Sequence, residues 1–331
     1  MTQSTGKQDK TEQTAVDNRK VFAYKVGIRF IRSIAVAFWV TVIAFTLIRL
    51  VPGDPASNRL GVDADPAALE AMRKQLGLDV PPIQQFINFF QGLIQGDLGT
   101  SLQFDREVSD IVFSALPVTL WLIALSVLIS LIIAIPLALF VATSKSVLVA
   151  YIFRSSTAVA IALPNFFIAL ILILIFSIRF QWAPLLGYTP EFPGNLEYLW
   201  LPAVVNATTL VSILSRVLYS SIGDTLREEF VETGIIRGIG RFRFLWYYIL
   251  KPSLAPTVVL LSYIMGVMLG TTVIMEAVFS LPGIGTELIS AVFNRDYPTV
   301  QAIVFIFGVI VVFFSFFGDL MAYWLDRRVK F

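Results

Sequence analysis

The stretch IVFSALPVTLWLIALSVLISLIIAIPLALFVATS, residues 111–144, contains no charged side chain. It is longer than the roughly 20 apolar residues that an α-helix needs to cross a bilayer. It is too long for one level span, so we expect a lead-in that ends near Pro117 and a span that continues to about Thr143. A backbone in hydrocarbon must satisfy its own hydrogen bonds, which a helix does within one segment. The stretch therefore predicts an α-helical membrane protein.

Other uncharged intervals extend this prediction over most of the chain. They are Ser33–Ile48, Ser155–Ile178, Tyr198–Ser215, Ser253–Met275 and Tyr297–Gly318. Each is close to, or longer than, the length of one membrane crossing. The first is short, but the long side chain of Arg49 can reach the membrane surface and so lengthen the span. Together with residues 111–144, these intervals predict an all-α fold with six transmembrane helices.

The composition supports this class and excludes several kinds of site. The chain has 56% hydrophobic residues, 15% charged residues and a mean hydropathy of +0.78, whereas soluble domains carry about 25% charged residues. It contains no Cys and no His, so the usual ligands of zinc and haem and the commonest general base are missing. We therefore expect no metal site, no catalytic residue and no nucleic-acid partner.

The distribution of Lys and Arg predicts the orientation of the chain. With six crossings and the N-terminus inside, 18 of the 25 Lys and Arg residues lie in inner segments. Because positive residues accumulate on the cytoplasmic side, both termini are expected there. Residues 1–25 are polar and are expected to form a disordered tail rather than a signal peptide, followed by a first transmembrane helix at 26–52. Residues 113–331 are expected to form a core of five transmembrane helices with a cytoplasmic loop at 221–252.

In this orientation residues 53–112 lie outside, and they carry the signals of a small helical segment. Asp65-Pro66 is typical of a helix start, and Gly77 is typical of a helix end. A second helix is expected to begin near Pro82, and one of its faces is apolar. That face must pack on the preceding helix, on the bilayer interface or on a partner, because exposed apolar surface is costly in water.

The cytoplasmic loop contains the stretch EFVETGIIRGIGRFRFLWYYILKP at residues 229–252, which is charged and rich in glycine. One face of a two-turn helix at its start would carry Phe230, Thr233, Gly234 and Arg237. On that helix Gly234 would let a partner's backbone approach closely, because glycine has no side chain. Gly238 would end the helix in a left-handed or turn conformation.

Short motifs follow one another from the end of the first predicted span to the start of the last. They are Val51-Pro52-Gly53-Asp54-Pro55, Leu76-Gly77-Leu78-Asp79, Gly96-Asp97-Leu98-Gly99-Thr100-Ser101, Leu116-Pro117-Val118-Thr119-Leu120, Glu232-Thr233-Gly234 with Gly238 and Ile249, the run from Glu276 to Gly285, and Arg295-Asp296-Tyr297-Pro298. This ordered set resembles the dipeptide, oligopeptide and nickel branch of ABC importer permeases, of the oligopeptide-permease type. The resemblance runs from about residue 26 to the C-terminus and implies the six-helix permease fold in a bacterial inner membrane.

The resemblance implies that the loop couples the permease to cytoplasmic ATPases. The implied coupling residues are Phe230, Glu232, Thr233, Gly234, Arg237 and Gly238. The chain has no Gly-x4-Gly-Lys-Ser/Thr motif for binding phosphates. We therefore expect no cofactor on this chain, with ATP and Mg held by two partner ATP-binding subunits.

Further partners are implied in the same way. They are a second six-helix permease subunit and an extracellular or periplasmic substrate-binding protein, in addition to the lipid bilayer. The resemblance implies that the two permease subunits differ and form a heterodimer, as is usual in the family. The sequence alone also allows a homodimer.

Polar residues within the predicted spans are candidates for lining a solute path. They are Asn165, Asn206, Thr209, Gly270, Thr271 and Thr272, with Glu276 at the outer end of the fifth span. Peptide backbones need such donors and acceptors, but Gly266 and Gly270 are also spaced as small residues are in helix packing. Glu276 has two possible roles. It can contact a substrate amine, or it can form a structural ion pair with Arg295.

We therefore expect one permease subunit of an ATP-driven importer of short peptides that works by alternating access. Nickel, glutathione or another small solute is the alternative within the same family. A secondary transporter without an ATPase partner is the alternative from another class. That class typically shows internal repeats, and the two halves of this sequence show no convincing repeat.

Overall fold

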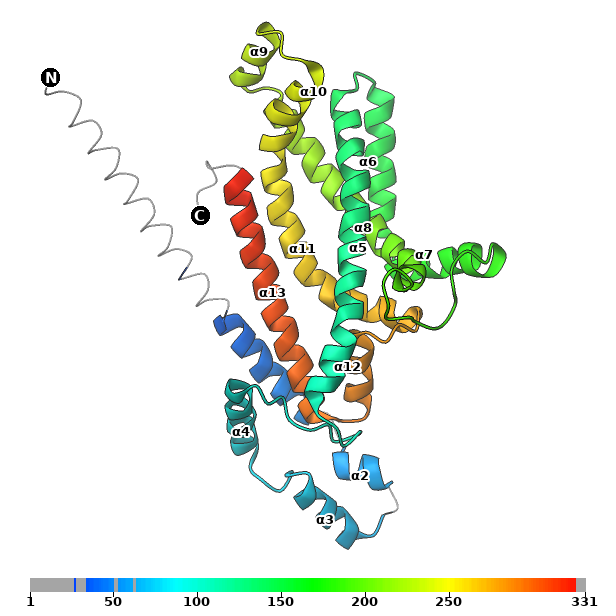
Figure 1. The fold of residues 1–331 in the computed structure, drawn as a ribbon, viewed down its shortest axis with the longest axis vertical. Coiled ribbons are helices and arrows are strands. Elements are labelled where there is room, and N and C mark those ends of the chain that lie inside the picture. The colour runs from blue at the N-terminus through cyan, green and yellow to red at the C-terminus, as the bar shows by residue number, and fades with distance from the viewer. Residues whose placement is uncertain (1–26, 28–33, 51–52, 62–63, 326–331) are drawn as a thin grey trace, which may run out of the picture.

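The computed structural model describes residue 27 and residues 34–50, 53–61 and 64–325 (Figure 1). The predicted tail at residues 1–25 lies outside this part of the chain. The described residues form helices Ile34–Leu50, α2 (Pro55–Leu60), α3 (Pro66–Gln75), α4 (Pro82–Gln95), α5 (Val108–Thr143), α6 (Val147–Ala162), α7 (Asn165–Leu172), the π-helix η1 (Ile173–Arg179), α8 (Asn195–Thr225), α9 (Glu229–Ile236), α10 (Arg241–Arg243), the π-helix η2 (Phe244–Leu250), α11 (Lys251–Val278), α12 (Ile284–Phe293) and α13 (Tyr297–Leu325).

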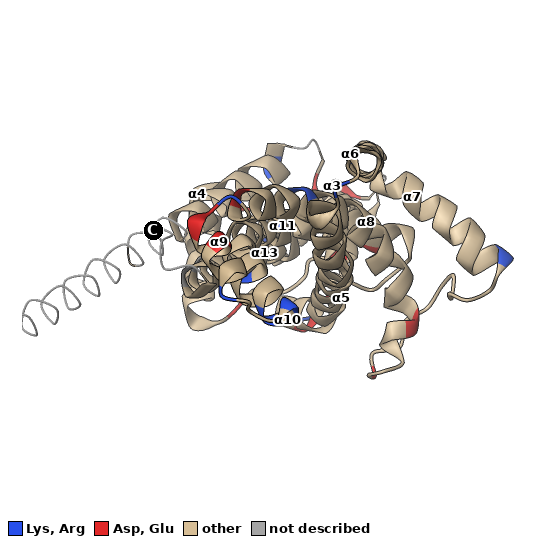
Figure 2. Cartoon of the chain, turned by 90° about the horizontal axis from the view of Figure 1, so that it is seen from above, with Lys and Arg blue, Asp and Glu red and all other residues tan. Residues whose placement is uncertain are grey.

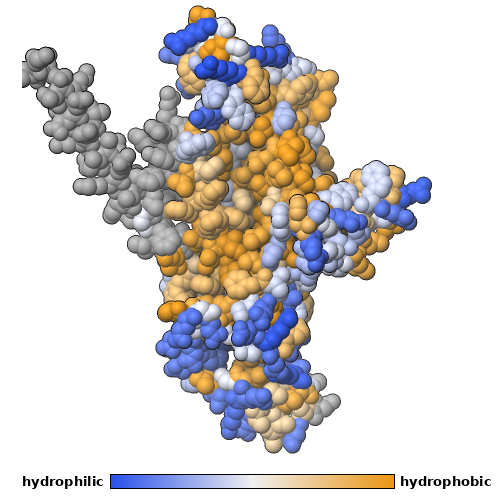
Figure 3. Space-filling view, in the orientation of Figure 1, coloured by the Kyte–Doolittle hydropathy of each residue, from blue (hydrophilic) through white to orange (hydrophobic). Residues whose placement is uncertain are grey.

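Among the described residues, 4 helical segments are long and apolar enough to cross a membrane. They are α5, α8, the continuous run of α10, η2 and α11, and α13. The bent pair of α6 with α7 and η1 would be a fifth, and helix Ile34–Leu50 is apolar but shorter. The prediction of an all-α membrane protein is confirmed, and the count of six spans stays a prediction. Figure 3 shows the matching surface, with an apolar belt between two hydrophilic ends.

The expected lead-in and the span to Thr143 lie on one helix, because α5 continues through Pro117 without a break. Val112 and Val118, on either side of that proline, are both buried. Burial of both flanks stabilises the helix across Pro117 and outweighs the hydrogen bond that proline cannot donate. The intrinsic preference of one residue is therefore overridden by packing.

The predicted third span is not a single straight helix. Its two halves, Val147–Ala162 and Asn165–Arg179, meet at an angle of 96°. Leu163 at the break has an extended backbone, as is usual for a residue before proline, and Pro164 has no N–H to continue the helix. As a result α7 extends away from the bundle in Figures 1 and 2.

The core is built around α8, which packs against α5, α6, α7 and α11. Leu199, Leu214 and Leu218 on this helix are fully buried. On the other side, α11 packs against α13 at very short range. A Cβ atom on Gly318 would lie 1.6 Å from the Ser262 hydroxyl oxygen, so only glycine fits at this crossing.

The segment between the first helix and α5 has the predicted helix limits. Asp65 caps α3 through a bond from the Ala67 N–H, and Gly77 and Gly96 have positive φ after α3 and α4. The same Asp-Pro signal at Asp54-Pro55 starts α2, which the sequence reasoning missed. These signals act within a few residues, and sequence alone is sufficient to find them.

The apolar face of α4 packs against the first helix rather than on α3. Phe86 contacts the rings of Phe38 and Phe45, and Phe90 contacts Phe38. The Arg49 guanidinium adds a polar link, with its Nη2 donating to Gln85 Oε1 at 2.6 Å. The segment is thereby attached to the bundle.

Candidate functional site

A short helix, α9, lies at one end of the bundle, on the loop that the sequence reasoning singled out (Figure 1). It spans Glu229–Ile236, and Glu229 and Glu232 lie in its first turn, where negative charge favours the helix dipole. Gly238 follows with φ +65°, and its N–H bonds to Ile235 O at 3.0 Å. The predicted helix and its glycine stop are confirmed.

One face of α9 packs against its own chain. Val231 and Gly234 are buried, and Phe230 contacts the ring of Tyr248 on η2. A Cβ atom on Gly234 would lie 3.1 Å from ring atoms of Phe244 and of Tyr248. The close approach that Gly234 permits is therefore between α9 and η2, and the expected approach by a partner's backbone at this residue is corrected. Phe230 and Gly234 do not share an outward face with Thr233 and Arg237.

The opposite face of α9 is exposed. It carries Glu229, Glu232, Thr233, Ile235, Ile236 and Arg237. Ile235 is 64% exposed and Ile236 86% exposed, and sequence reasoning had not assigned them a role. The available signal was a pair of neighbouring β-branched apolar residues, Ile235 and Ile236, two positions before the glycine stop. They place an apolar tip within a charged surface, which is the composition of many contact surfaces.

A stack of aromatic rings connects α9 to the long helix α11. The rings of Phe244 and Tyr248 are 5.8 Å apart and nearly parallel. The backbone of η2 continues directly into α11, and its last residues, Ile249 and Leu250, are buried. A movement of α9 would therefore displace η2, on whose rings it packs, and with η2 the helix α11.

At the far end of α11, the Glu276 carboxylate is fully buried. Its Oε1 accepts a bond from the Thr119 hydroxyl of α5 at 2.5 Å. Its Oε2 accepts bonds from the N–H groups of Gly285 and Thr286 at 2.8 and 3.1 Å. Thr119 in turn accepts a bond from the N–H of Ile284 at 3.1 Å. The carboxylate thus caps the N-terminus of α12 and joins three helices, α5, α11 and α12.

The positions around this carboxylate have no room for a side chain, so glycine is required there. A Cβ atom on Gly283 would lie 2.3 Å from the Glu276 carboxyl carbon. On Gly285 it would lie 2.7 Å from the Cα atom of Val273, which belongs to the backbone of α11. The run from Glu276 to Gly285 therefore folds as a tight turn around its own first side chain. We call Thr119, Glu276 and Gly283–Thr286 the α12 junction.

The candidate path residues divide into two groups. Asn165 and Thr209 meet, with the Thr209 hydroxyl donating to Asn165 Oδ1 at 2.7 Å. Asn206 is buried one turn away on α8, and neither its amide nitrogen nor its oxygen has a partner among the described residues. The bend at Pro164 places Asn165 against α8 and so creates this polar group.

The second group lies on α11. Thr272 is fully buried and donates to Leu269 O, whereas Thr271 is half-buried and donates to Met268 O. A Cβ atom on Gly270 would meet nothing within 4 Å, whereas one on Gly266 would lie 3.3 Å from Val311 of α13. The two glycines therefore have different surroundings, because Gly266 packs a helix crossing and Gly270 faces open space.

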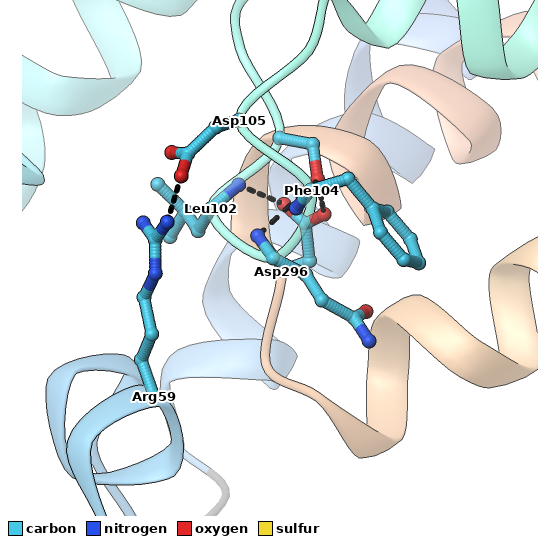
Figure 4. Close-up of polar contacts among 7 residues, drawn as sticks. Arg59, Leu102, Phe104, Asp105 and Asp296 are labelled. Atoms are coloured by element: carbon cyan, nitrogen blue, oxygen red, sulfur yellow. Dashed lines mark hydrogen bonds and ion pairs between the residues drawn. The ribbon is translucent and has the colours of Figure 1, made fainter.

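A second buried acid, Asp296, holds the loop before α5 (Figure 4). It accepts bonds from the Ser101 hydroxyl at 2.5 Å, the Leu102 N–H at 3.0 Å and the Thr299 hydroxyl at 2.8 Å. Arg59 of α2 forms an ion pair with Asp105 on the outer side of the same loop. Asp296 stands directly before α13, so this clamp fixes the loop to the start of that helix.

Two family models cover almost all of the chain. Residues 134–331 match the model of the binding-protein-dependent transport system inner membrane component, and residues 25–124 match the model of the N-terminal part of such membrane components. The two matched segments lie on either side of the middle of α5. Similarity therefore extends over both the segment α2–α4 and the bundle.

Curated relatives match over nearly their whole length. A Brucella suis biovar 1 protein named as a peptide permease is 32% identical over 88% of this chain and 93% of its own. The oligopeptide transport system permease protein AppB of Bacillus subtilis is 28% identical over 92% of this chain and 98% of its own. The glutathione transport system permease protein GsiC of Escherichia coli is 27% identical over 92% of this chain and 97% of its own.

Proposed function

The chain belongs to the family of binding-protein-dependent transport system inner membrane components, and on this premise we propose how it works. It is a permease component of an ABC importer of the peptide type. In our proposal the chain crosses the membrane six times with both termini in the cytoplasm, and residues 53–112 lie outside. It forms half of a path for short peptides and is driven by ATPases that dock on α9.

The observation that supports this proposal is that one face of α9 packs on its own chain while the opposite face is exposed. Val231 and Gly234 attach it to η2, while Ile235 and Ile236 project from the bundle. A partner that binds the exposed isoleucines would exert force on α9, which packs against the aromatic rings of η2. Because packed side chains transmit displacement with little compression, α11 would move with α9.

In our proposal, the movement of α11 is transmitted to the α12 junction at its other end. Its groups come from α5, α11 and α12, so a shift of α11 must either carry α12 with it or strain the bonds of Glu276. Bistable packing of this kind converts a small displacement into the opening or closing of a path. Glu276 serves here as a positioning residue, since protein donors occupy both of its oxygens.

The path itself is proposed to run past the polar group of Asn165, Asn206 and Thr209, and past Gly270 and Thr271. The Asn206 amide is enclosed by its own chain and has no partner among the described residues. In our proposal it bonds to a solute or water when the helices around it separate, because a buried amide without a partner is costly. Thr272 supports the fold instead, because it is fully buried within its own chain. A second permease subunit would complete the wall on the open side of Gly270.

The energy source lies on other subunits in this proposal. Two ATP-binding subunits would hold ATP and Mg and dock on the α9 side, and a substrate-binding protein would deliver the solute on the opposite side. Family membership argues against the secondary-transporter alternative, since the matching family model describes components of binding-protein-dependent transport systems. We propose a heterodimer as the permease pair.

Co-expression with candidate ATPase and permease subunits of peptide-type ABC importers from the same organism tests the proposal. We expect a detergent-stable complex whose ATP hydrolysis rises when the binding protein and a short peptide are added in proteoliposomes. Ile236→Asp should abolish association with the ATPases while leaving the chain folded. If the ATPases co-purify equally well with the Ile236→Asp chain, docking on α9 is wrong.

The choice of solute needs its own experiment, because the named relatives include both peptide and glutathione permeases. Uptake of radiolabelled tripeptide into proteoliposomes should be competed by unlabelled di- and tripeptides. Competition by glutathione or Ni²⁺ alone would move the assignment to the alternative solutes of the same family.

A further inference from the structure

A cavity lies between α4, the loop before α5 and the start of α13, away from α9 and from the proposed path. Its volume is about 260 Å³. The polar lining residues are Arg49, Gln85, Asn88, Asp97, Tyr297 and Gln301. The Asp296 clamp forms part of its wall, because Leu102 and Tyr297, the residues that flank the clamp, both line the cavity. The cavity is thus lined by five segments, which are the first helix, the turn after α3, α4, the loop before α5 and the start of α13.

Arg49 brings a half-buried positive charge to this cavity. Its Nη1 donates to Phe45 O at 3.1 Å and its Nη2 to Gln85 Oε1 at 2.6 Å, which uses two of the five N–H groups of a guanidinium. The guanidinium also lies 3.5 Å from the ring centroid of Phe45 and 4.9 Å from that of Tyr297. Among the described residues, no carboxylate forms an ion pair with it. A half-buried guanidinium with unused N–H groups and no ion-pair partner among the described residues can bind an anion.

Gln301 provides the second, independent observation. It is only 3% exposed, yet it lines the cavity, and its side-chain amide makes no hydrogen bond within the described part of the chain. Because the residue lines the cavity, its amide can donate to a group that enters this space. The acid that lines the cavity, Asp97, already accepts from the Gly99 N–H at 2.7 Å. The cavity thus brings together the Arg49 cation, the unbonded Gln301 amide and one exposed acid, Asp97.

We propose that this cavity binds an oxyanion, a carboxylate or a phosphate, on Arg49 and Gln301. A guanidinium presents parallel N–H groups that match the two oxygens of either group. The oxyanion could come from a small soluble molecule or from the headgroup of a phospholipid beside the first helix. The site does not depend on the proposed transport function, since its test measures binding and needs no ATPase.

The test uses the full-length chain in nanodiscs of phosphatidylcholine. Binding of inorganic phosphate, acetate, alanyl-alanine and the C-terminal amide of alanyl-alanine is measured by calorimetry and by thermal melting. A second preparation, in equal amounts of phosphatidylcholine and phosphatidylglycerol, measures the effect of an anionic headgroup. Alanyl-alanine binding above its amide identifies a free carboxylate, and a higher melting temperature with phosphatidylglycerol alone identifies the headgroup.

The informative variant is Gln301→Leu, which removes an unpaired amide at nearly constant volume. It should weaken oxyanion binding about tenfold, or remove the headgroup effect, while the unliganded chain melts no lower than the wild type. Gln103→Leu is the matched control, because Gln103 Oε1 is buried with no partner among the described residues and Gln103 does not line the cavity. Saturable binding of no probe together with no headgroup effect, or equal binding by Gln301→Leu, would overturn the proposal.

Discussion

Thr119 and Glu276 are 157 residues apart in the sequence, yet the Thr119 hydroxyl donates to Glu276 Oε1 at 2.5 Å. The contact joins two short motifs that the sequence shows as unrelated, one at the start of the second predicted span and one at the end of the fifth. Through the N–H of Ile284, Thr119 also bonds to α12. One hydroxyl therefore serves as both donor and acceptor at the meeting point of three helices.

Replacing Thr119 by Val should destabilise the chain by about 1–3 kcal/mol, because the change leaves a buried carboxylate oxygen and the Ile284 N–H without this partner. Thermal melting in detergent and SDS unfolding in mixed micelles measure the loss. Thr119→Ser keeps the hydroxyl and should lose much less. Equal stability of Thr119→Val and the wild type would contradict the structural role of this bond.

Alanine substitutions at Gly285 of the α12 junction and at Gly270 of α11 should distinguish a glycine required for lack of space from one that only lowers helix propensity. Gly285→Ala would place a Cβ atom 2.7 Å from the Val273 backbone, so we expect a loss of about 1–3 kcal/mol or more. Gly270→Ala meets nothing within 4 Å and lies inside a helix, so it should gain about 0.5–1 kcal/mol. Unfolding curves of the two variants provide the comparison, and similar losses for both would refute the geometry.

The exposed tip of α9 should matter for association and little for stability. Ile236→Ala should change unfolding by no more than about 0.5 kcal/mol, since the side chain is 86% exposed. It should weaken ATPase binding about tenfold if the residue is a contact anchor. Ile83→Ala, at a 77% exposed isoleucine of α4, is the control and should leave binding unchanged. Equal affinities would remove Ile236 from the docking surface.

The Asp296 clamp should govern how firmly the loop before α5 is held. Asp296→Leu removes three acceptor contacts, so amide hydrogen exchange across residues 101–106 should become faster. Asp105→Asn weakens only the ion pair with Arg59, and Asp105 is 66% exposed, so it should have little effect. Mass spectrometry of the exchanged peptides measures both. Unchanged exchange in Asp296→Leu would show that other contacts hold the loop.

Glu287 on α12 should give the chain a small, distinctive pH dependence. Burial raises the pKa of Glu287 above 4.5, and the nearby Arg106 charge opposes this rise in part. The folded chain then holds this proton more tightly than the unfolded chain, so stability falls as pH rises from 4.5 through the raised pKa. Glu287→Gln should lose that slope and be the more stable form above it. Melting temperatures across this range test the prediction, and parallel curves would contradict it.

Local signals were sufficient for much of the fold. The limits of α3 follow from Asp65-Pro66 and Gly77, and the stop of α9 follows from Gly238. Such caps satisfy backbone groups within a few residues, so no distant neighbour is needed to read them. Hydropathy likewise determined the membrane class, because the bilayer acts on every segment in the same way.

The prolines and helix α9 show where local signals end. Pro117 and Pro136 lie inside a continuous α5, whereas Pro164 breaks a predicted span by 96°. The same residue type gives opposite results because packing around α5 stabilises the helix across the lost bond. Gly234 was expected to face a partner, but its open side is filled by Phe244 and Tyr248, rings whose position depends on how η2 folds back.

The sequence by itself determined that this is an all-α membrane protein with a short glycine-stopped helix in its charged loop, since composition and caps are local properties. Only the tertiary structure decided that Glu276 caps α12, that Asn165 meets Thr209, and that Arg49 and Gln301 share a cavity. Each of these pairs is set by how helices cross. Helix crossings depend on the summed packing of many side chains, which no single motif specifies.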